Sequence, residues 1–279
     1  MPRRSQPLRV AIDTGGTFTD CVWIHRGRLR MLKVFSTPDD PSQAIVEAIG
    51  KINHQGELVI LHGTTVGTNT LLERKGARTA LVTTAGFEDA IEIGRQARPK
   101  LYDFFFDRIE PLVPADLRFG MEERTASDGK ILTKPSAADL KSLASHVKAK
   151  QPNSIAISLL FSFANPRNEQ AVAAALEPLG VPLSISHQIL PEFREYERTS
   201  TVVINAYLQP VMQRYFENLE QRLSRVEQRF SAASKRSKMI AASAPEGHRH
   251  APRIFVMQSS GGITALAAAA TEPVRTVLS

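Results

Sequence analysis

Near its amino terminus the chain contains Asp13-Thr14-Gly15-Gly16-Thr17-Phe18-Thr19-Asp20. Apolar segments with strand character, residues 8–12 and 21–24, flank this stretch, which predicts two strands joined by a glycine-containing turn. Because glycine has no Cβ, the backbone amides of Gly15 and Gly16 can approach an anion closely. The turn therefore has features of a phosphate-binding loop as well as those of a hairpin.

The polar side chains of this loop suit a nucleotide that carries magnesium. Thr17 and Thr19 can donate hydrogen bonds to phosphate oxygens, and Asp13 and Asp20 can hold Mg²⁺, usually through its waters. The stretch is not a Walker A loop, because no Gly-Lys-Ser/Thr follows, and it is not a dinucleotide fingerprint, because its glycines are adjacent and a strand follows. The alternative is an ordinary threonine-rich hairpin whose polar groups bond only to the turn. We favour phosphate binding, with Asp13 as the strongest candidate.

Composition and charge exclude several classes of protein. The net charge of +7 is spread over short basic clusters at residues 3–4, 26–33, 95–100 and 235–253, with no basic stripe interleaved with aromatics, so a nucleic-acid partner is not expected. No apolar run approaches the ~20 residues of a membrane span, and the basic amino terminus lacks the apolar region of a signal peptide. The lone Cys21 excludes an intrachain disulfide and predicts a cytoplasmic protein.

Hydrophobic periodicity predicts alternating strands and helices. We expect strands at 9–12, 20–25 and 29–34, a helix at 41–52 capped by Asp40, a strand at 58–61, a helix at 66–74, a strand at 78–82 and a helix at 87–93. Further along we expect helices at 136–148 and 169–179, strands at 155–160 and 183–186, and a mostly helical region at 193–230 in which Pro210 can start a second helix. A strand at 254–257 and a turn at 259–262 are then expected to lead into a helix near residue 263.

Two stretches lack this periodicity. Residues 96–128 contain adjacent phenylalanines and are either a lid over a substrate or an insertion whose aromatic rings fill a crevice. We favour the insertion, since three adjacent phenylalanines are too apolar to remain in water. Residues 231–252 are predicted to be a flexible loop. His248 and His250 lie in that loop without further ligands, so a metal site is not expected there.

Five stretches together resemble the hydantoinase A/5-oxoprolinase family, within the superfamily of acetate and sugar kinases, Hsp70 and actin. They are Asp13 to Asp20; His62-Gly63-Thr64-Thr65 running into residues 69–74; residues 84–89; residues 195–199 running into 205–207; and residues 257–262. The resemblance implies an α/β, actin- or sugar-kinase-like (ribonuclease H-like) lobe, with a mixed sheet, flanking helices and the start of a second lobe. The predicted order of strands and helices agrees with this independently. We place an N-terminal actin-like domain at 1–190 and the beginning of a hydantoinase A domain at 191–279.

The resemblance implies an ATP-dependent hydrolase of cyclic amides of the 5-oxoproline or hydantoin type, with ATP and Mg²⁺ as cofactors. In this family a second, hydantoinase B-like polypeptide takes part in ring opening, and related members carboxylate ketones. Family members continue with a second phosphate loop and an adenosine-binding region that are not in this sequence, so we expect an N-terminal part of such an enzyme. The alternatives are a non-catalytic fragment that acts as a binding or partner subunit, and a subunit of an ATP-dependent ketone carboxylase. No residue is predicted to be catalytic.

The resemblance also extends the candidate site. The residues expected to bind the nucleotide are Asp13, Gly15, Gly16, Thr17, Thr19, His62, Gly63, Thr64 and Thr65, and those expected to bind the metal are Asp13 and Asp20. His62 ends a strand where a helix begins, and helix N-termini attract anions, but a ring bonded to backbone groups is an equal alternative.

Other motif residues have open roles. Arg95 and Arg98 can meet a substrate carboxylate or remain solvated, and Glu195 and Arg198 can simply support a helix. Residues 259–262 are either an anion-binding nest or a turn between a strand and a helix.

Overall fold

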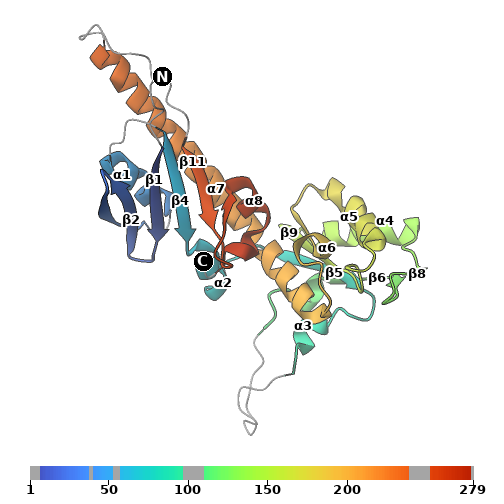
Figure 1. Cartoon of the computed structure of the whole chain (residues 1–279). Helices are drawn as coiled ribbons and strands as arrows, with labels where there is room; N and C mark the ends of the chain where they lie inside the picture. Colours follow the sequence, from blue (N-terminus) through green and yellow to red (C-terminus); the bar gives the residue numbers. More distant parts are fainter. Residues whose placement is uncertain (1–6, 38–39, 53–56, 97–109, 239–251, 278–279) are drawn as a thin grey trace, which may run out of the picture. The chain divides into compact units, whose positions relative to one another are not determined.

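The computed structural model describes residues 7–37, 40–52, 57–96, 110–238 and 252–277, and for residues 226–238 it describes the backbone alone. The chain divides into two compact units, each described separately below (Figure 1). Unit 1 comprises residues 1–69 and 212–279, and unit 2 comprises residues 70–211. Over the described ranges, no helix has both the length and the apolar character that crossing a membrane requires.

Unit 1 is built on a mixed sheet with the strand order β12-β11-β4-β1-β2-β3. Its strands are β1 (Leu8–Thr14), β2 (Phe18–His25), β3 (Arg28–Phe35), β4 (Leu58–Thr64), β11 (Arg253–Met257) and β12 (Ile263–Ala265). Its helical segments are α1 (Ser42–Ile52), α2 (Val66–Leu72, which runs into unit 2), the later part of α7 (Glu195–Lys238), α8 (Leu266–Thr271) and the 3₁₀ turn Pro273–Thr276. Strands β1, β2 and β3 form an antiparallel meander, whereas β4 and β11 run parallel to β1.

One face of this sheet packs against α1 and α7 and forms the core of unit 1. The buried apolar residues are Val10, Ile12, Cys21, Val34, Ala44, Ile45, Ala48, Ile60, Leu219 and Leu223. As predicted, Asp40 caps α1, because its carboxylate accepts a hydrogen bond from the Ser42 amide at 3.3 Å; it also pairs with Arg222 of α7. The side chains that alternate with the core residues point to the opposite face of the sheet. Several large apolar ones there are exposed, namely Phe18, Ile24, Leu29, Met31, Phe35, Met257 and Ile263.

Unit 2 contains a parallel sheet with the strand order β10-β9-β5-β6. These strands are β5 (Thr79–Thr84), β6 (Arg118–Met121), β9 (Ser154–Ser158) and β10 (Leu183–Ile185). The other elements are α3 (Ala90–Ile93), the 3₁₀ turns Ala115–Leu117 and Glu177–Leu179, β7 (Arg124–Thr125), β8 (Ile131–Thr133), α4 (Ala137–Ala149), α5 (Arg167–Leu176) and α6 (Ser186–Ile189). Helices α4 and α5 share a core with the sheet, and Ser136 caps α4 as predicted by accepting from the Asp139 amide at 3.1 Å.

The strand predicted at residues 78–82 exists, but it does not belong to the first sheet. It is β5, the centre of the unit 2 sheet, and the position beside β4 in the first sheet is occupied by β11, far along the chain. The local pattern identifies a buried strand but does not specify its neighbour, because parallel pairing depends on contacts that are distant in sequence. Residues 70–211 therefore interrupt the first sheet between β4 and β11.

Three predictions toward the carboxyl end were wrong. Helix α7 continues through Pro210 to Lys238, so Pro210 starts no new helix and residues 231–238 are not a loop. Proline removes one backbone donor, but the buried residues on both sides of it, Leu208 and Met212, hold the helix in place. Residues 263–265 form β12, which pairs with β11, and the helix begins only at Leu266. His248 and His250 lie outside the described residues.

Apart from Gln96, the expected lid or insertion at residues 96–128 is described only from residue 110 onward. Its adjacent phenylalanines and Arg98 lie outside the described residues. The described part supplies β6 and β7, and β6 extends the unit 2 sheet beside β5. At least this part of the stretch is therefore a strand of the sheet, which its weak periodicity did not reveal.

Candidate functional site

The predicted site residues gather at the carboxyl ends of two neighbouring parallel strands, β1 and β4. In the register of this pair, Asp13 lies beside Gly63 and Thr14 lies beside Thr64. The loop of residues 15–17 follows β1, whereas Thr65 leads from β4 into α2. The structure thus brings together both halves of the predicted site at the end of a sheet where α/β proteins commonly bind ligands.

The loop between β1 and β2 leaves part of its backbone available to a ligand. The Gly15 amide donates to the Phe18 carbonyl at 3.0 Å, which closes the hairpin. Within the described residues, the amides of Gly16 and Thr17 form no intramolecular hydrogen bond, and both residues are exposed. A Cβ on Gly15 would lie 3.0 Å from the Phe18 carbonyl oxygen, so the tight closure favours glycine. The hairpin uses one of the three amides, and two can bind an anion.

Asp13 and Asp20 lie opposite each other on β1 and β2, on the side of the sheet away from the core. Asp13 is exposed, and Asp20 is partly buried and pairs with Lys33 at 3.1 Å. The Asp13 carboxylate lies over Gly63, since a Cβ on Gly63 would be only 3.2 Å from Asp13 Oδ1. Mg²⁺ usually binds through one or two carboxylates together with waters and phosphate oxygens. The two aspartates fit a magnesium ion that arrives with a phosphate group.

No group of three or more His, Cys, Asp or Glu side chains among the described residues can hold a metal by itself.

Thr19 supports the loop from inside the protein. Its hydroxyl is fully buried and lies 2.9 Å from Ser36 Oγ, which in turn donates to the Gly15 carbonyl at 2.8 Å. Since the Ser36 proton is used in that bond, Thr19 donates its own proton to Ser36. The exposed Thr17 accepts from the Ser36 amide through its carbonyl and keeps its side chain outside. Ser36 was not predicted from the sequence, although it directly orients the loop.

The threonines that end β1 and β4, together with Thr65, link the two strand ends to each other. Thr65 Oγ1 donates to the Thr14 carbonyl at 2.9 Å, and Thr14 Oγ1 donates to the Gly63 carbonyl at 3.3 Å. Thr64 Oγ1 accepts from the Val66 amide at 3.2 Å, at the start of α2. Helix α2 has seven residues, so we attribute the position of these groups to the strand ends rather than to a helix dipole.

His62 points into the core of unit 1 and is fully buried. Its Nε2 lies 2.7 Å from the Tyr215 hydroxyl of α7, and its Nδ1 lies 3.4 Å from the Ile12 carbonyl. Burial lowers the pKa of His62 from 6.5 to about 4, so the ring is neutral at physiological pH. The structure therefore places His62 beneath the site, on the opposite side of β4 from Asp13, and adds Tyr215, which the sequence did not indicate.

This burial predicts a specific pH dependence of stability. Between pH 6.5 and 4 the unfolded chain binds a proton at His62 and the folded protein does not, so stability falls as the pH is lowered through this window. The expected slope from this one group is at most about 1.4 kcal/mol per pH unit. Urea unfolding at a series of pH values should show a shallower dependence in His62→Gln than in the wild type. A variant of the exposed His146, His146→Gln, should follow the wild type; an unchanged slope in His62→Gln would contradict the assignment.

Other motif residues have structural partners in unit 2. The guanidinium of Arg198 is buried and donates to the carbonyls of Leu159 and Glu192 at 2.8 and 3.0 Å, while also contacting the Glu195 carboxylate. Asn205 donates to Ser184 Oγ at 3.0 Å. Arg95 and Glu197 form an exposed ion pair. These contacts favour a supporting role for this motif.

The turn at residues 259–262 uses several of its polar groups internally. The Gln258 amide donates to the Gly262 carbonyl at 2.8 Å, and the Gly261 amide donates to the Gln258 carbonyl at 2.9 Å. The amide and hydroxyl of Ser259 both donate to the Arg275 carbonyl, at 2.8 and 3.0 Å. These bonds favour a turn, but the turn joins the strands β11 and β12 and not a strand and a helix as predicted. They also hold Arg275 against the end of β11.

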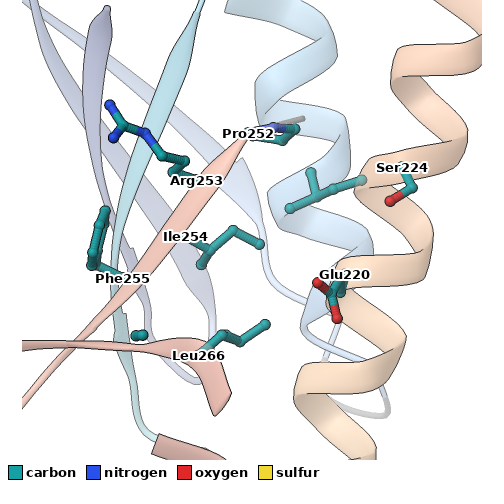
Figure 2. A pocket seen from close by; sticks show the side chains of 9 residues that line it. Glu220, Ser224, Pro252, Arg253, Ile254, Phe255 and Leu266 are labelled. Atoms are coloured by element: carbon teal, nitrogen blue, oxygen red, sulfur yellow. The ribbon is translucent and has the colours of Figure 1, made fainter. Parts of the chain in front are cut away.

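Unit 1 also has a pocket of about 320 Å³ away from the predicted site. It is lined by Glu220, Leu223 and Ser224 of α7 and by residues 252–255, Ala265 and Leu266. Ile254 and Leu266 point toward α7, whereas Arg253 and Phe255 point away from it (Figure 2). None of the predicted site residues lines this mainly apolar pocket.

Comparison with known proteins connects this geometry to a family. The family model for the hydantoinase/oxoprolinase N-terminal region matches residues 9–180, and the hydantoinase/oxoprolinase model matches residues 198–279. The caprolactamase subunit alpha of Pseudomonas jessenii is 35% identical over 77% of this chain and 33% of its own length. The acetophenone carboxylase gamma subunit of Aromatoleum aromaticum is 34% identical over 73% of this chain and 31% of its own length. The chain thus spans about a third of the length of these relatives.

The solved structures confirm the predicted fold. The crystal structure of the ATP-dependent caprolactamase from Pseudomonas jessenii superposes with a TM-score of 0.72 at 30% identity, covering 95% of this chain and 39% of that one. The α/β, actin-like lobe with a mixed sheet and flanking helices is therefore established. By sequence and by structure, the chain belongs to the hydantoinase/oxoprolinase family.

Proposed function

We propose that this chain is the phosphate-binding part of an ATP-dependent enzyme that opens cyclic amides of the 5-oxoproline, hydantoin or lactam type. The observation that carries the proposal is the Asp13 carboxylate lying over Gly63, beside the two exposed amides of Gly16 and Thr17. This arrangement combines donors for phosphate oxygens with ligands for a hard cation. A related caprolactamase, named as ATP-dependent, supports both the cofactor and the substrate class.

In this proposal each residue of the loop has a definite task. Asp13, with Asp20 beside it, orients the water shell of Mg²⁺, and the amides of Gly16 and Thr17 with the Thr17 hydroxyl contact phosphate oxygens. Thr19 acts through Ser36 to hold the Gly15 carbonyl, which keeps the loop amides outward. Bound Mg–ATP supplies a phosphoryl group that activates the amide carbonyl for attack by water. Such transfer depends mainly on positioning and charge neutralisation, which these residues provide.

The remaining assignments are proposals that the relatives support. Because caprolactamase and acetophenone carboxylase components are named as subunits, we propose that a second, hydantoinase B-like subunit works with this chain. The carboxylase names also support the second candidate, a subunit of an ATP-dependent ketone carboxylase. We also propose that the protein is cytoplasmic and that its domain boundary lies at residue 190.

The proposal is tested by isothermal titration of the chain with Mg–ATP. We expect saturable heat with Mg–ATP, much weaker heat with ATP in EDTA, and competition by Mg–tripolyphosphate, since the contacts are to phosphates and metal. The absence of heat under all conditions would contradict the proposal. ATP turnover stimulated by a lactam, measured after adding the cognate second subunit, would favour the hydrolase; stimulation by a ketone with bicarbonate would favour the carboxylase.

A further inference from the structure

Two residues far apart in the sequence meet directly beneath the proposed site. His62 lies on β4 and Tyr215 lies on α7, and their side chains are 0% and 6% exposed. The distance from His62 Nε2 to the Tyr215 hydroxyl oxygen is 2.7 Å. The side chains of Thr64 and Thr14 lie near the same hydroxyl. Neither ring can touch a ligand on the outer side of β4.

The chemistry of the partners fixes the direction of each hydrogen bond. The Ile12 carbonyl can only accept, so His62 Nδ1 carries the ring proton and Nε2 is the acceptor for the Tyr215 hydroxyl. Tyr215 stays protonated because burial raises its pKa well above the ordinary value.

The nearby threonines bind the backbone at the end of β4. Thr14 donates its hydroxyl proton to the Gly63 carbonyl, and Thr64 Oγ1 accepts from the Val66 amide. The directed chain of bonds runs from the Tyr215 hydroxyl through His62 to the Ile12 carbonyl.

This chain of bonds ties the backbone just before Asp13 to the residue just before Gly63. Ile12 directly precedes Asp13, and His62 directly precedes Gly63. A shift of either strand end would move the Asp13 carboxylate relative to the surface of β4. The bonds therefore help to set the contact between Asp13 and Gly63, which is one of the two features on which the proposed site depends.

We propose that Tyr215, acting through His62, is a positioning residue of the nucleotide site. Its hydroxyl holds the neutral ring in one tautomer and locks the carboxyl ends of β1 and β4 in register, so that the Asp13 carboxylate lies over Gly63. This inference rests on the proposed function for its effect on binding. The effect of the Tyr215 hydroxyl on the ligand-free protein does not depend on that function.

Tyr207 on the same helix provides a matched control. Both tyrosines are 6% exposed, and the Tyr207 hydroxyl has no hydrogen bond within the described part of the chain. Both phenylalanine variants remove one hydroxyl from a largely buried tyrosine and keep the ring. We expect Tyr215→Phe to weaken Mg–ATP binding about tenfold, as loss of a residue that orients metal ligands typically does. Tyr207→Phe should bind like the wild type.

A second measurement on the ligand-free protein separates this inference from the proposed function. In ¹⁵N-histidine spectra, assigned with His62→Gln, we expect the wild-type His62 to be protonated at Nδ1, and Tyr215→Phe to change its Nε2 shift. Amide exchange at residues 12–15 and 62–65 should be faster in Tyr215→Phe than in Tyr207→Phe. If the wild type does not bind Mg–ATP, the proposed function fails, and these two readouts still decide the positioning role. Equal exchange in the two variants would overturn the inference, and so would equal Mg–ATP affinity of the two variants when the wild type binds Mg–ATP.

Discussion

Arg198→Met is expected to lower the free energy of unfolding of unit 2 by about 3–5 kcal/mol, the usual cost of removing one partner of a buried charge network. The Arg198 side chain is fully buried. Its guanidinium donates to the Leu159 and Glu192 carbonyls, contacts the Glu195 carboxylate and lies 5.3 Å from the centre of the Phe163 ring. Methionine fills part of the volume but leaves those acceptors without a donor.

The matched control for this substitution is Arg95→Met. Arg95 belongs to the same region of unit 2, but its ion pair with Glu197 is largely exposed, and such pairs contribute about 0–1 kcal/mol. Because the chain has two compact units, urea unfolding followed by circular dichroism should be combined with hydrogen exchange to locate the loss in β5, β9 and β10. If Arg198→Met unfolds within 1 kcal/mol of Arg95→Met, about the upper worth of an exposed pair, the supporting role of Arg198 is wrong.

Asp13→Ala is expected to weaken Mg–ATP binding about 10- to 100-fold while leaving the fold intact. A charge-assisted contact is worth about 1.5–3 kcal/mol, and each 1.4 kcal/mol corresponds to about a factor of ten in affinity. Asp13 is exposed and, within the described residues, forms no intramolecular hydrogen bond or ion pair, so its loss removes no support from the sheet. Relief of its repulsion with Asp20 should leave thermal stability equal or slightly higher.

Asp128→Ala is the control for this prediction. Asp128 lies in a turn of unit 2 and caps that turn by accepting from the Lys130 amide at 2.9 Å, with no connection to β1. Titration calorimetry should give wild-type affinity for Asp128→Ala and strongly reduced affinity for Asp13→Ala. Equal affinities in the two variants would remove Asp13 from the site.

The sequence identified the loop residues but not the side of the sheet on which each lies. Residues two positions apart on a strand point to the same face of the sheet. Thr19 is two residues from Cys21, and His62 is two residues from Ile60, and both of those apolar side chains are in the core. Applied strictly, this period would have turned Thr19 and His62 inward. Tyr215 gave no local signal, because its role depends on a contact with a residue 153 positions away.

For the fold too, features set by neighbouring residues were predicted, and features set by contacts distant in sequence were not. The strands and helices were largely predicted, since alternation and capping act over a few residues, as Ser136 and Asp40 show. Membership of a sheet was not predicted, because β5 and β11 are both short apolar strands and nothing within them specifies the neighbour. Pro210 misled the prediction of α7 because the packing of the helix outweighs the loss of one backbone hydrogen bond.

The central claim, that the loop after β1 and the end of β4 bind the phosphates of a magnesium nucleotide, is tested most directly by selective ¹⁵N-glycine labelling. The chain contains 16 glycines, so the spectrum is simple enough to assign by single substitutions. Addition of Mg²⁺ with a non-hydrolysable ATP analogue should shift the amide signals of Gly16 and Gly63 most, with Gly120 and Gly180 of unit 2 unchanged. Saturable binding that leaves the amide signals of Gly16 and Gly63 unshifted, or that shifts only the signals of glycines in unit 2, would contradict this claim.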